Sequence, residues 1–475
     1  MGDEFDIIVV GAGISGVSAA LAALETAEEM GVRLNVLMLE RVRPELFGGS
    51  SRHTTAYLRL DDNCEKVSEY LVEDAVKYLT EKTNIEYWKK LQIEGTKAIK
   101  WIKDHGVKIE KVPMPMFLTA KRPRCAPVGN GLAVIETLLS YARSKGLQVA
   151  YESTAWKLSL DDNGNINGVY VRQRDGDSVR VNAKAIILAT GGFQKNINML
   201  VEYIGPNAIY LDSILGKEEI YHMGEGIRMA LEVGAALDGE WGGFHAEPVD
   251  ARSKEVEPVV LIYPYGILIN IYGHRFVDEG MGTVEEYYDY VAKVIFQQPL
   301  NKAFLIFDKK VLEIPGHERA ILSGLPPIES DSLEGLARKL IDYGLKDPSK
   351  FLETINEYNK AVQPGKFDPF NIDGKSTRGL NPEKSNWAIT IDTPPFYAYP
   401  IEARITYPYI GLKTDLNGRV LDTSGNWIKG LWAVGELMGG IYFKGHLGGT
   451  SFLRGLTFGK IAGEDAVKYV LKLRN

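Results

Sequence analysis

The sequence predicts an α/β fold in which a Rossmann-like dinucleotide-binding domain carries an inserted, smaller α+β domain. Two observations lead to this prediction. Gly11, Gly13 and Gly16 form a GxGxxG pattern between an apolar run, FDIIVV, and a helical pattern. Apolar runs that end in small-residue turns then recur along the chain, whose 475 residues are enough for two or three domains.

The first unit reads as a buried strand, a glycine turn and a helix, FDIIVVGAGISGVSAALAALE. In such a turn the first glycine permits the tight bend, the second lets a pyrophosphate approach, and the third lets the helix pack on the strand. A second apolar run, LNVLMLE, ends in Glu40, which is placed to accept hydrogen bonds from ribose hydroxyls. The ordered unit predicts dinucleotide binding, whereas a glycine turn alone would be unspecific.

Later segments indicate a long cofactor that is held along its whole length. The loop GGSSRHTT offers glycines and hydroxyls, and the run AKAIILATGGF ends in another small-residue turn. The segment GLWAVGELMGG repeats the strand and the turn and adds an acid. Together these segments contribute Gly48, Gly49, Ser50, Ser51, Thr190, Gly191, Gly192 and Glu436 as candidate cofactor-binding residues. Their recurrence fits a long dinucleotide better than NAD in a single crevice.

The segment YFKGHLGGTSFLRGL, near the end of the chain, leads paired glycines into a helical pattern. Ser451 and Phe452 begin this predicted helix. The free N–H groups at its start and the positive end of its dipole favour an electron-rich ligand. We therefore expect this helix to begin at the cofactor.

In their order, these motifs resemble the flavoproteins of the fumarate reductase and succinate dehydrogenase group over nearly the whole chain. The resemblance implies a GR2-type flavoprotein fold with one FAD, Glu225 near the flavin, and the last helix directed at the flavin pyrimidine. It also implies an FAD-binding domain at 1–240 and 385–475, interrupted by a capping domain at 241–384. Succinate dehydrogenases attach the flavin through a histidine in SHT. Here the motif is SRHT, with Ser51 at the aligned position, so we expect non-covalent FAD.

Residues at the substrate positions differ from those of the fumarate and succinate enzymes. His245 in EWGGFHAEP matches their substrate-binding histidine, but Thr283 falls near the position of their catalytic arginine. Tyr407 stands where a second histidine is expected, and His446 stands where an arginine precedes the terminal glycines. Steroid ring dehydrogenases of the same superfamily have a tyrosine in place of His446, so this position follows the class of substrate. The missing arginine argues against fumarate reduction.

Motifs in the first loop, the cap and the return segment, such as GGSSRHT, GGFHAEPVD and IDTPPFYAYPI, resemble the tricarballylate dehydrogenase branch. This resemblance implies oxidation of a carbon–carbon single bond beside a carboxylate, as in tricarballylate to cis-aconitate, with hydride transfer to flavin N5. It also implies a polycarboxylate substrate and a membrane-associated electron-transfer partner. We expect His446 and Tyr407 at the proton-transfer end of the site, and His245 with Arg404 at the carboxylate-binding end. The alternatives are a ketosteroid-like ring dehydrogenase, a fumarate-reductase-like alkene reductase, and a binding scaffold without a working flavin.

The composition adds further limits. The net charge of -7 argues against general nucleic-acid binding. Cys64 and Cys125 form no CxxC or metal-spaced pair, which predicts an intracellular protein without a disulfide framework and without a metal site. The first residues, MGDEFDIIVVG, contain no basic leader, and no apolar run approaches the roughly 20 residues that span a bilayer. We expect a cytoplasmic protein that meets a membrane only through a partner.

Overall fold

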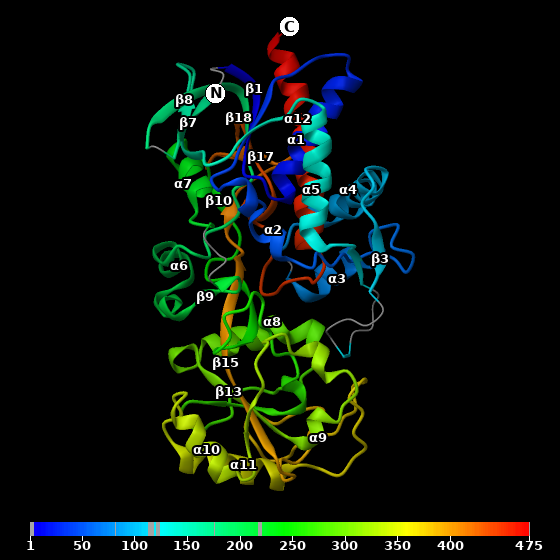
Figure 1. The fold of residues 1–475 in the computed structure, drawn as a ribbon, viewed down its shortest axis with the longest axis vertical. Coiled ribbons are helices and arrows are strands. Elements are labelled where there is room, and N and C mark those ends of the chain that lie inside the picture. The colour runs from blue at the N-terminus through cyan, green and yellow to red at the C-terminus, as the bar shows by residue number, and fades with distance from the viewer. Residues whose placement is uncertain are drawn as a thin grey trace.

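The structure is a computed structural model that describes residues 4–80, 82–112, 118–119, 124–174, 176–216 and 221–474. The molecule is elongated, with an upper part that holds both termini and a lower part that contains α10 and α11 (Figure 1). The long strand β15, Phe396–Pro408, runs from the middle of the molecule into the lower part. The first three residues, which belong to the N-terminal segment without a basic leader, lie outside the described ranges.

The upper part is built on an eight-stranded sheet whose main path is β17-β18-β8-β1-β2-β5. At its centre, β1 (Glu4–Val10) lies parallel to β2 (Val36–Leu39) on one side and to β8 (Ser178–Leu188) on the other. The predicted late strand is β18 (Trp427–Ala433), which pairs in parallel with β8. Because β1, β2, β8 and β18 are parallel, the turns that the sequence singled out meet at one edge of the sheet.

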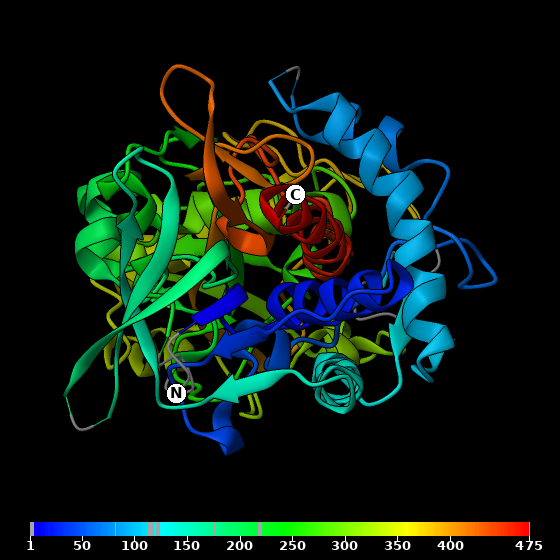
Figure 2. The ribbon, with the colours of Figure 1, turned by 90° about the horizontal axis from the view of Figure 1, so that it is seen from above.

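Two helices from opposite ends of the chain pack together beside this sheet. They are α1 (Ile14–Glu29) and α12 (Ser451–Arg474), which lie side by side in both ribbon views (Figures 1 and 2). The close approach requires glycine on α12. A Cβ atom at Gly459 would lie 2.3 Å from the carbonyl oxygen of Ser15, and one at Gly463 would lie 2.2 Å from that of Ala19.

The lower part is built on a six-stranded sheet with the path β11-β15-β13-β12, and β9 and β14 pair with β15. Its strands are β9 (Asp212–Ser213), β11 (Phe244–Asp250), β12 (Ile267–Asn270), β13 (Ala303–Asp308) and β14 (Ile328–Ser330). Its helices include α8 (Val284–Phe296), α10 (Leu333–Ile341) and α11 (Pro348–Ala361). The second sheet therefore includes β15, which lies beyond residue 384, and the domain boundaries stay a prediction.

The remaining elements complete these two parts. They are α2 (Gly49–His53), α3 (Leu71–Tyr78), α4 (Ile85–Asp104), β3 (Ile109–Lys111), β4 (Cys125–Pro127), α5 (Asn130–Ser144), β5 (Gln148–Ala150), β6 (Thr154–Leu160), β7 (Ile166–Arg172), α6 (Ile197–Ile204), α7 (Glu225–Glu232), β10 (Leu237–Asp238), α9 (Lys309–Leu312), β16 (Gly411–Leu412) and β17 (Arg419–Leu421). The predicted α/β fold with a dinucleotide-type sheet and a second α+β part is confirmed.

One prediction about covalent structure was wrong. Cys64 and Cys125 form a disulfide whose Cα atoms are 5.8 Å apart, although 61 residues separate them in sequence. The pairing depends on tertiary structure, because Cys125 forms a β-bridge with Leu58 and thereby reaches the turn at Cys64. The spacing of the two cysteines in the sequence does not indicate this contact. The cytoplasmic location stays a prediction, and disulfides are uncommon in that compartment.

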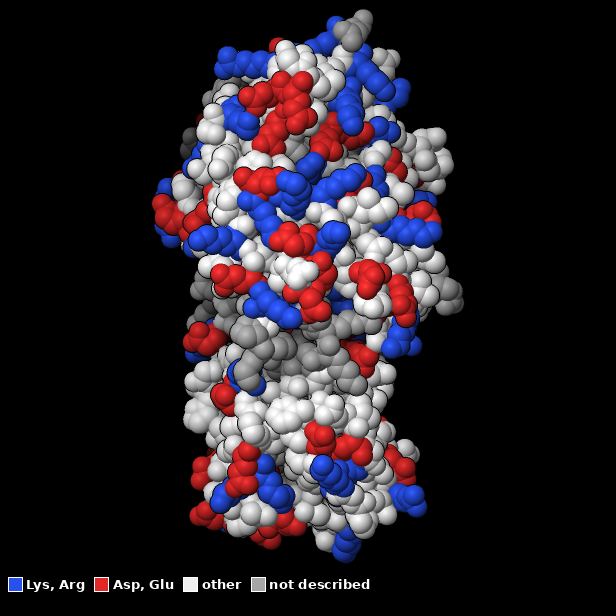
Figure 3. All heavy atoms as spheres, turned by 90° about the vertical axis from the view of Figure 1, so that its right-hand side faces the viewer, with Lys and Arg blue, Asp and Glu red and all other residues white. Residues whose placement is uncertain are grey.

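The surface mixes charges of both signs. On the face drawn in Figure 3, basic and acidic side chains alternate over the upper part and gather again at the lower end. Within the described ranges, no helix is both long and apolar enough to cross a membrane.

Candidate active site

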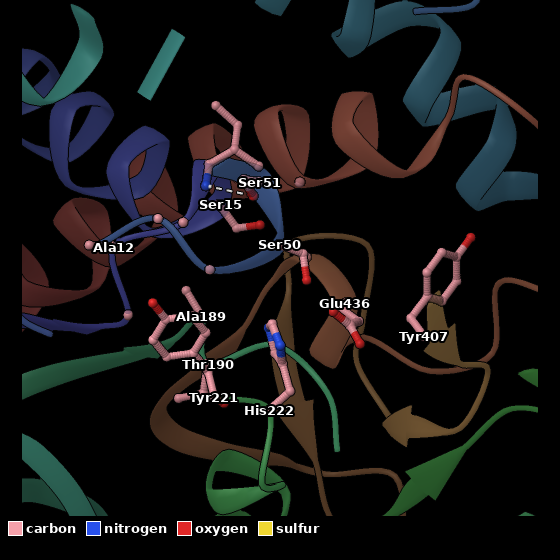
Figure 4. Close-up of a pocket in the computed structure, with 18 of the residues that line it drawn as sticks. Ala12, Ser15, Ser50, Ser51, Ala189, Thr190, Tyr221, His222, Tyr407 and Glu436 are labelled. Carbon is pink, nitrogen blue, oxygen red and sulfur yellow. Dashed lines mark hydrogen bonds between the residues drawn. The ribbon is translucent and has the colours of Figure 1, made fainter. Parts of the chain in front are cut away.

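A deep cavity opens where the carboxyl ends of the parallel strands meet the start of α12 (Figure 4). Its empty space, including the open mouth, is about 1460 Å³. It is lined by almost every residue that the sequence predicts to bind a cofactor: Gly11, Gly13, Glu40, Gly48, Gly49, Ser50, Ser51, Thr190, Gly191, Glu225, Glu436, Ser451 and Phe452. Gly16 and Gly192, the other two predicted residues, lie just behind this wall and shape its turns.

The glycine turn has the geometry that phosphate binding requires. Gly11 adopts φ +107°, and a Cβ there would lie 2.4 Å from the carbonyl oxygen of Ala189. A Cβ at Gly16 would lie 1.9 Å from the carbonyl oxygen of Gly11, so only glycine lets α1 begin this close to the strand. At Gly13 the same test finds no atom nearer than Ser51 Oγ at 3.4 Å. The backbone is thus open to a ligand at the second glycine.

The start of α1 and the carboxylate of Glu40 flank this turn. Ser51 Oγ accepts a hydrogen bond of 3.2 Å from the N–H of Ile14, in the first turn of α1 (Figure 4). Glu40 accepts hydrogen bonds from the N–H groups of Ala12 at 3.0 Å and Val42 at 3.1 Å. Burial raises the pKa of Glu40 above its usual value, although these N–H groups act in the opposite direction. A carboxylate has about four lone-pair sites, so Glu40 has capacity left for ribose hydroxyls.

Buried polar atoms without hydrogen-bond partners in the cavity wall show that the cavity suits FAD. Thr190 Oγ1, Thr406 Oγ1 and Arg454 Nε are buried and have no hydrogen-bond partner among the residues that the structure describes. All three side chains line the cavity. Buried polar groups in folded proteins nearly always have partners, so a ligand with polar atoms along its length fits this wall. The start of α12 at Ser451 faces the same space, where its N–H groups favour an electron-rich ring.

Glu225 lines the same cavity on the side of Glu40, and its place near the flavin stays a prediction. It begins α7, lines the cavity, and forms an ion pair of 2.6 Å with Arg41, the residue after Glu40. The pair joins two segments that are 184 residues apart at the same end of the cavity.

Three of the four predicted catalytic residues come together beside the inner wall. Tyr407 lines the cavity, and its hydroxyl is 2.5 Å from Nδ1 of His446. The rings of His446 and His245 stack with centroids 4.1 Å apart and an interplanar angle of 29°. His245 faces Tyr407 directly across strands β11 and β15, which explains how segments far apart in sequence build one cluster.

Burial and charge shift the pKa values of the two histidines in opposite directions. Burial lowers the pKa of His245, but the hydrogen bonds and charges of Asp289 and Glu247 outweigh it, so that this pKa is raised above its usual value. Burial and then the charge of His245 lower the pKa of His446 well below its usual value. At neutral pH His446 is therefore the uncharged member of the pair.

Arg404 does not join this cluster. Its Nε donates to Glu402 Oε1 at 2.8 Å, and its Nη2 donates to the carbonyl oxygen of Ser253 at 3.1 Å. Its assignment to the carboxylate-binding end stays a prediction that these contacts do not support. A β-bulge between His245 and Ala246 changes the strand register here, and sequence alternation does not predict it.

Other charged residues gather near the site instead, and sequence reasoning missed them. Arg59 donates from Nε to the carbonyl oxygen of Gly448 at 2.9 Å and pairs with Asp74 at 2.7 Å. Arg124 forms a buried ion pair with Glu285, on the first turn of α8. The signal that could have found Arg59 and Arg124 is that both are charged residues in otherwise apolar segments, LRL and PRCAP.

Glu257 is a further residue that the sequence did not indicate. It lines the cavity and adopts φ +55°, a left-handed conformation that is uncommon outside glycine. Burial, followed by the negative charge of Glu247, raises its pKa to about 8 from an ordinary value of 4.5, while His245 acts in the opposite direction. A protonated carboxyl group therefore faces the cavity at neutral pH.

Comparison with known proteins agrees with this geometry. The family model described as an FAD binding domain matches residues 6–453. A probable fumarate reductase of Shewanella frigidimarina (strain NCIMB 400) is 26% identical over 480 residues, which cover 98% of this chain and 75% of that protein.

Two solved structures share the fold over nearly the whole chain. The open conformation of a flavocytochrome c3 fumarate reductase has a TM-score of 0.76 at 24% identity, over 99% of this chain and 79% of that one. The 3-ketosteroid-Δ4-(5α)-dehydrogenase of Rhodococcus jostii RHA1 has a TM-score of 0.71 at 25% identity, over 98% and 97%. With the cavity described above, the match over residues 6–453 shows that the chain belongs to the FAD binding domain family, within the fumarate reductase and succinate dehydrogenase flavoprotein superfamily, and is an FAD-dependent oxidoreductase.

Proposed function

We propose that the protein oxidises a carbon–carbon single bond beside a carboxylate, and that its substrate is a polycarboxylate of the tricarballylate type. The observation that carries the proposal is the pairing of Tyr407 with His446 at the cavity wall, next to the His245 ring. FAD, when bound without a covalent link, supplies the hydride acceptor at N5. The relative from Shewanella, a probable fumarate reductase, supports chemistry at a bond beside a carboxylate.

The proton that leaves the substrate carbon is assigned to Tyr407 and His446. The Tyr407 oxygen takes this proton while its own proton passes to Nδ1 of His446 over the 2.5 Å hydrogen bond. Loss of one proton to this pair, together with the hydride that bound FAD would accept, would leave a carbon–carbon double bond in the substrate. His446 can accept the proton of the Tyr407 hydroxyl because its lowered pKa keeps its ring uncharged.

Positive charge near the site supports a substrate with several carboxylates. Burial opposes the charge of His446, and Arg59 and Arg454 lower its pKa further because their own positive charges lie close to it. The guanidinium of Arg454 also lies 5.6 Å from the Tyr407 ring centroid. These cations would stabilise the negative charge that builds up when a proton leaves a carbon beside a carboxylate.

The test is anaerobic bleaching of the bound flavin by tricarballylate, succinate and a 3-ketosteroid. We expect tricarballylate or a close analogue to reduce the flavin fastest. Replacement of His446 with Ala should slow that reduction by roughly 100-fold or more, the usual scale for a general acid–base, while FAD stays bound. His274→Ala, at an exposed hairpin in the lower part, is the matched control and should reduce at the wild-type rate. Wild-type reduction by His446→Ala would remove His446 from the mechanism.

Ring dehydrogenation of a ketosteroid-like substrate is the second candidate. It is favoured by the similarity to the Rhodococcus enzyme and by an aromatic wall in which Tyr407 lies within 6.0 Å, between ring centroids, of both Tyr409 and Tyr442. Flavin bleaching by the ketosteroid and by none of the carboxylates would establish it in place of the first. Alkene reduction, the reverse direction, would use the same groups. We also propose, from the family branch alone, that a membrane-associated protein receives the electrons.

A further inference from the structure

We propose that Asp289 is a positioning residue that holds His245 as a buried imidazolium and thereby leaves His446 as the proton acceptor of the site. The assignment of chemical roles rests on the proposed function, whereas the protonation states do not. Asp289 lies in the middle of α8, 44 residues from His245 in sequence, and is buried.

The first argument is how completely Asp289 fixes the ring. Oδ1 of Asp289 is 2.7 Å from Nδ1 of His245, and the same oxygen accepts the backbone N–H of Ala246 at 3.0 Å. The register between β11 and β15 shifts between these two residues, because β15 has one extra residue, Thr406, opposite them. One carboxylate oxygen therefore binds both the backbone at the register shift and the ring of His245. The imidazole therefore has one orientation, with Nδ1 toward Asp289.

The second argument concerns the other carboxylate oxygen. Oδ2 of Asp289 accepts Nζ of Lys293 at 2.7 Å and the hydroxyl of Tyr409 at 3.2 Å. Lys293 alone would neutralise Asp289 and leave His245 uncharged. A second carboxylate favours the charged form of His245, because Glu247 Oε1 lies 3.6 Å from Nε2 of His245. Two buried carboxylates thus face one lysine, and a protonated His245 completes the balance of charge.

The third argument is the neighbouring ring. The imidazoles of His245 and His446 stack at 4.1 Å between centroids, so two positive charges would repel each other strongly. Because His245 has a carboxylate on each ring nitrogen and His446 has the phenol of Tyr407, the charge resides on His245. The stacking then keeps His446 neutral.

The ionisable groups that act on the pair come from every element packed around it. Among the described residues they are Tyr288, Asp289 and Lys293 on α8, Glu247 on β11, Glu257 after it, Tyr407 and Tyr409 on β15, Tyr442 before His446, and Arg59 and Arg454 from the upper part. Glu257 is protonated in the neutral range, so it does not alter the balance between the two carboxylates and the two cations.

The test is nitrogen NMR of the FAD-loaded protein labelled with ¹⁵N-histidine, titrated from about pH 5.5 to 9. The chain has seven histidines, and His245→Asn and His446→Asn assign the two signals. We expect the His245 signal to titrate above the ordinary imidazole pKa of 6.5 and the His446 signal to titrate well below it. A neutral His245 at pH 6.5 would overturn the proposal.

Three variants separate the effect of charge from that of a hydrogen bond alone. Asp289→Asn should lower the midpoint of the His245 titration by at least one pH unit and let His446 take up a proton. Tyr409→Phe removes one hydrogen bond to the same carboxylate without changing its charge, and should leave the midpoint within about 0.3 unit. Lys293→Gln removes the cation that pairs with the other oxygen of Asp289 and should raise the midpoint. This variant still tests the proposal if Asp289→Asn does not fold. An unchanged midpoint in both charge variants would refute the role of Asp289. Failure of every carboxylate to bleach the flavin would refute the proposed function and leave these titrations intact.

Discussion

Replacing Glu40 with Gln tests whether this carboxylate binds the adenosine ribose of FAD. Its carboxylate accepts the N–H groups of Ala12 and Val42 and lines the cavity, where its remaining lone-pair sites can accept ribose hydroxyls. A hydrogen bond to a charged group contributes about 1.5–3 kcal/mol, and one between neutral groups about 0.5–1.5 kcal/mol. The loss for two ribose hydroxyls is therefore about 2–3 kcal/mol, which corresponds to a rise in the Kd for FAD of roughly 30- to 150-fold.

The assay is titration of the apoprotein with FAD and with FMN, followed by flavin fluorescence. FMN lacks the adenosine ribose and serves as the matched ligand, so its Kd should change by less than about threefold, a few tenths of a kcal/mol. Thermal melting of both apoproteins checks that the fold is intact. Equal weakening of FAD and FMN would show that Glu40 acts only through the glycine turn at Ala12. An unchanged Kd for FAD would refute the ribose contact itself.

Three further outcomes follow from the packing, the charges and the disulfide. Gly463→Ala should destabilise the protein by about 1–3 kcal/mol, since its Cβ would lie 2.2 Å from the backbone oxygen of Ala19, and thermal melting should show it. Gly365→Ala, whose Cβ would meet only the Lys375 residue at 3.4 Å or more, is the control and should melt like the wild type. Because the folded-state pKa of Glu257 is raised to about 8 from 4.5, its contribution to stability is lost as pH rises from about 4.5 through 8. The Tm advantage of Glu257→Gln in the apoprotein should therefore grow between pH 5 and pH 8.5, and a constant difference would contradict this pKa. Reduction of the Cys64–Cys125 disulfide, which bridges 61 positions, should lower stability by about 4 kcal/mol in the chain-entropy model. Thiol titration of denatured protein should find two thiols only after reduction, and two before it would refute the disulfide.

The cofactor end of the molecule could be predicted from sequence because its rules are local. Gly11, Gly13 and Gly16 have fixed spacing, and each spacing corresponds to a backbone requirement that holds in any strand–turn–helix unit. Glu40 follows from the same unit, since the second strand ends beside the first. The turn at Glu436 could be predicted as part of the same cofactor site, because parallel strands bring their carboxyl ends to one edge of a sheet.

The substrate end could be predicted only in part, because its contacts depend on how distant elements pack. His245, Tyr407 and His446 were indicated by a family pattern, and the structure brings them together. Asp289 has no local signal, since it contacts His245 only when α8 lies across the register shift between β11 and β15. One extra residue moves a side chain to the other face of a strand, and the extra Thr406 puts Arg404 opposite Glu247, on the Tyr407 side of β15. Arg404 is nevertheless bonded to Glu402 and Ser253 and not to the cluster, and strand alternation predicts neither contact.

The pairing of α1 with α12 also has a consequence for biosynthesis. The cavity wall includes both Gly11 and Gly455, so a ribosome must add a further 444 residues after the first glycine before the last one exists. At typical translation rates this takes roughly 20 to 90 seconds. Throughout that interval the groove of α1 that receives Gly459 and Gly463 has no partner helix, and the nucleotide turn has only part of its wall. Flavin capture is therefore a late event in the life of the nascent chain. The apolar face of α1 that packs on α12 therefore stays uncovered until the final helix has been made.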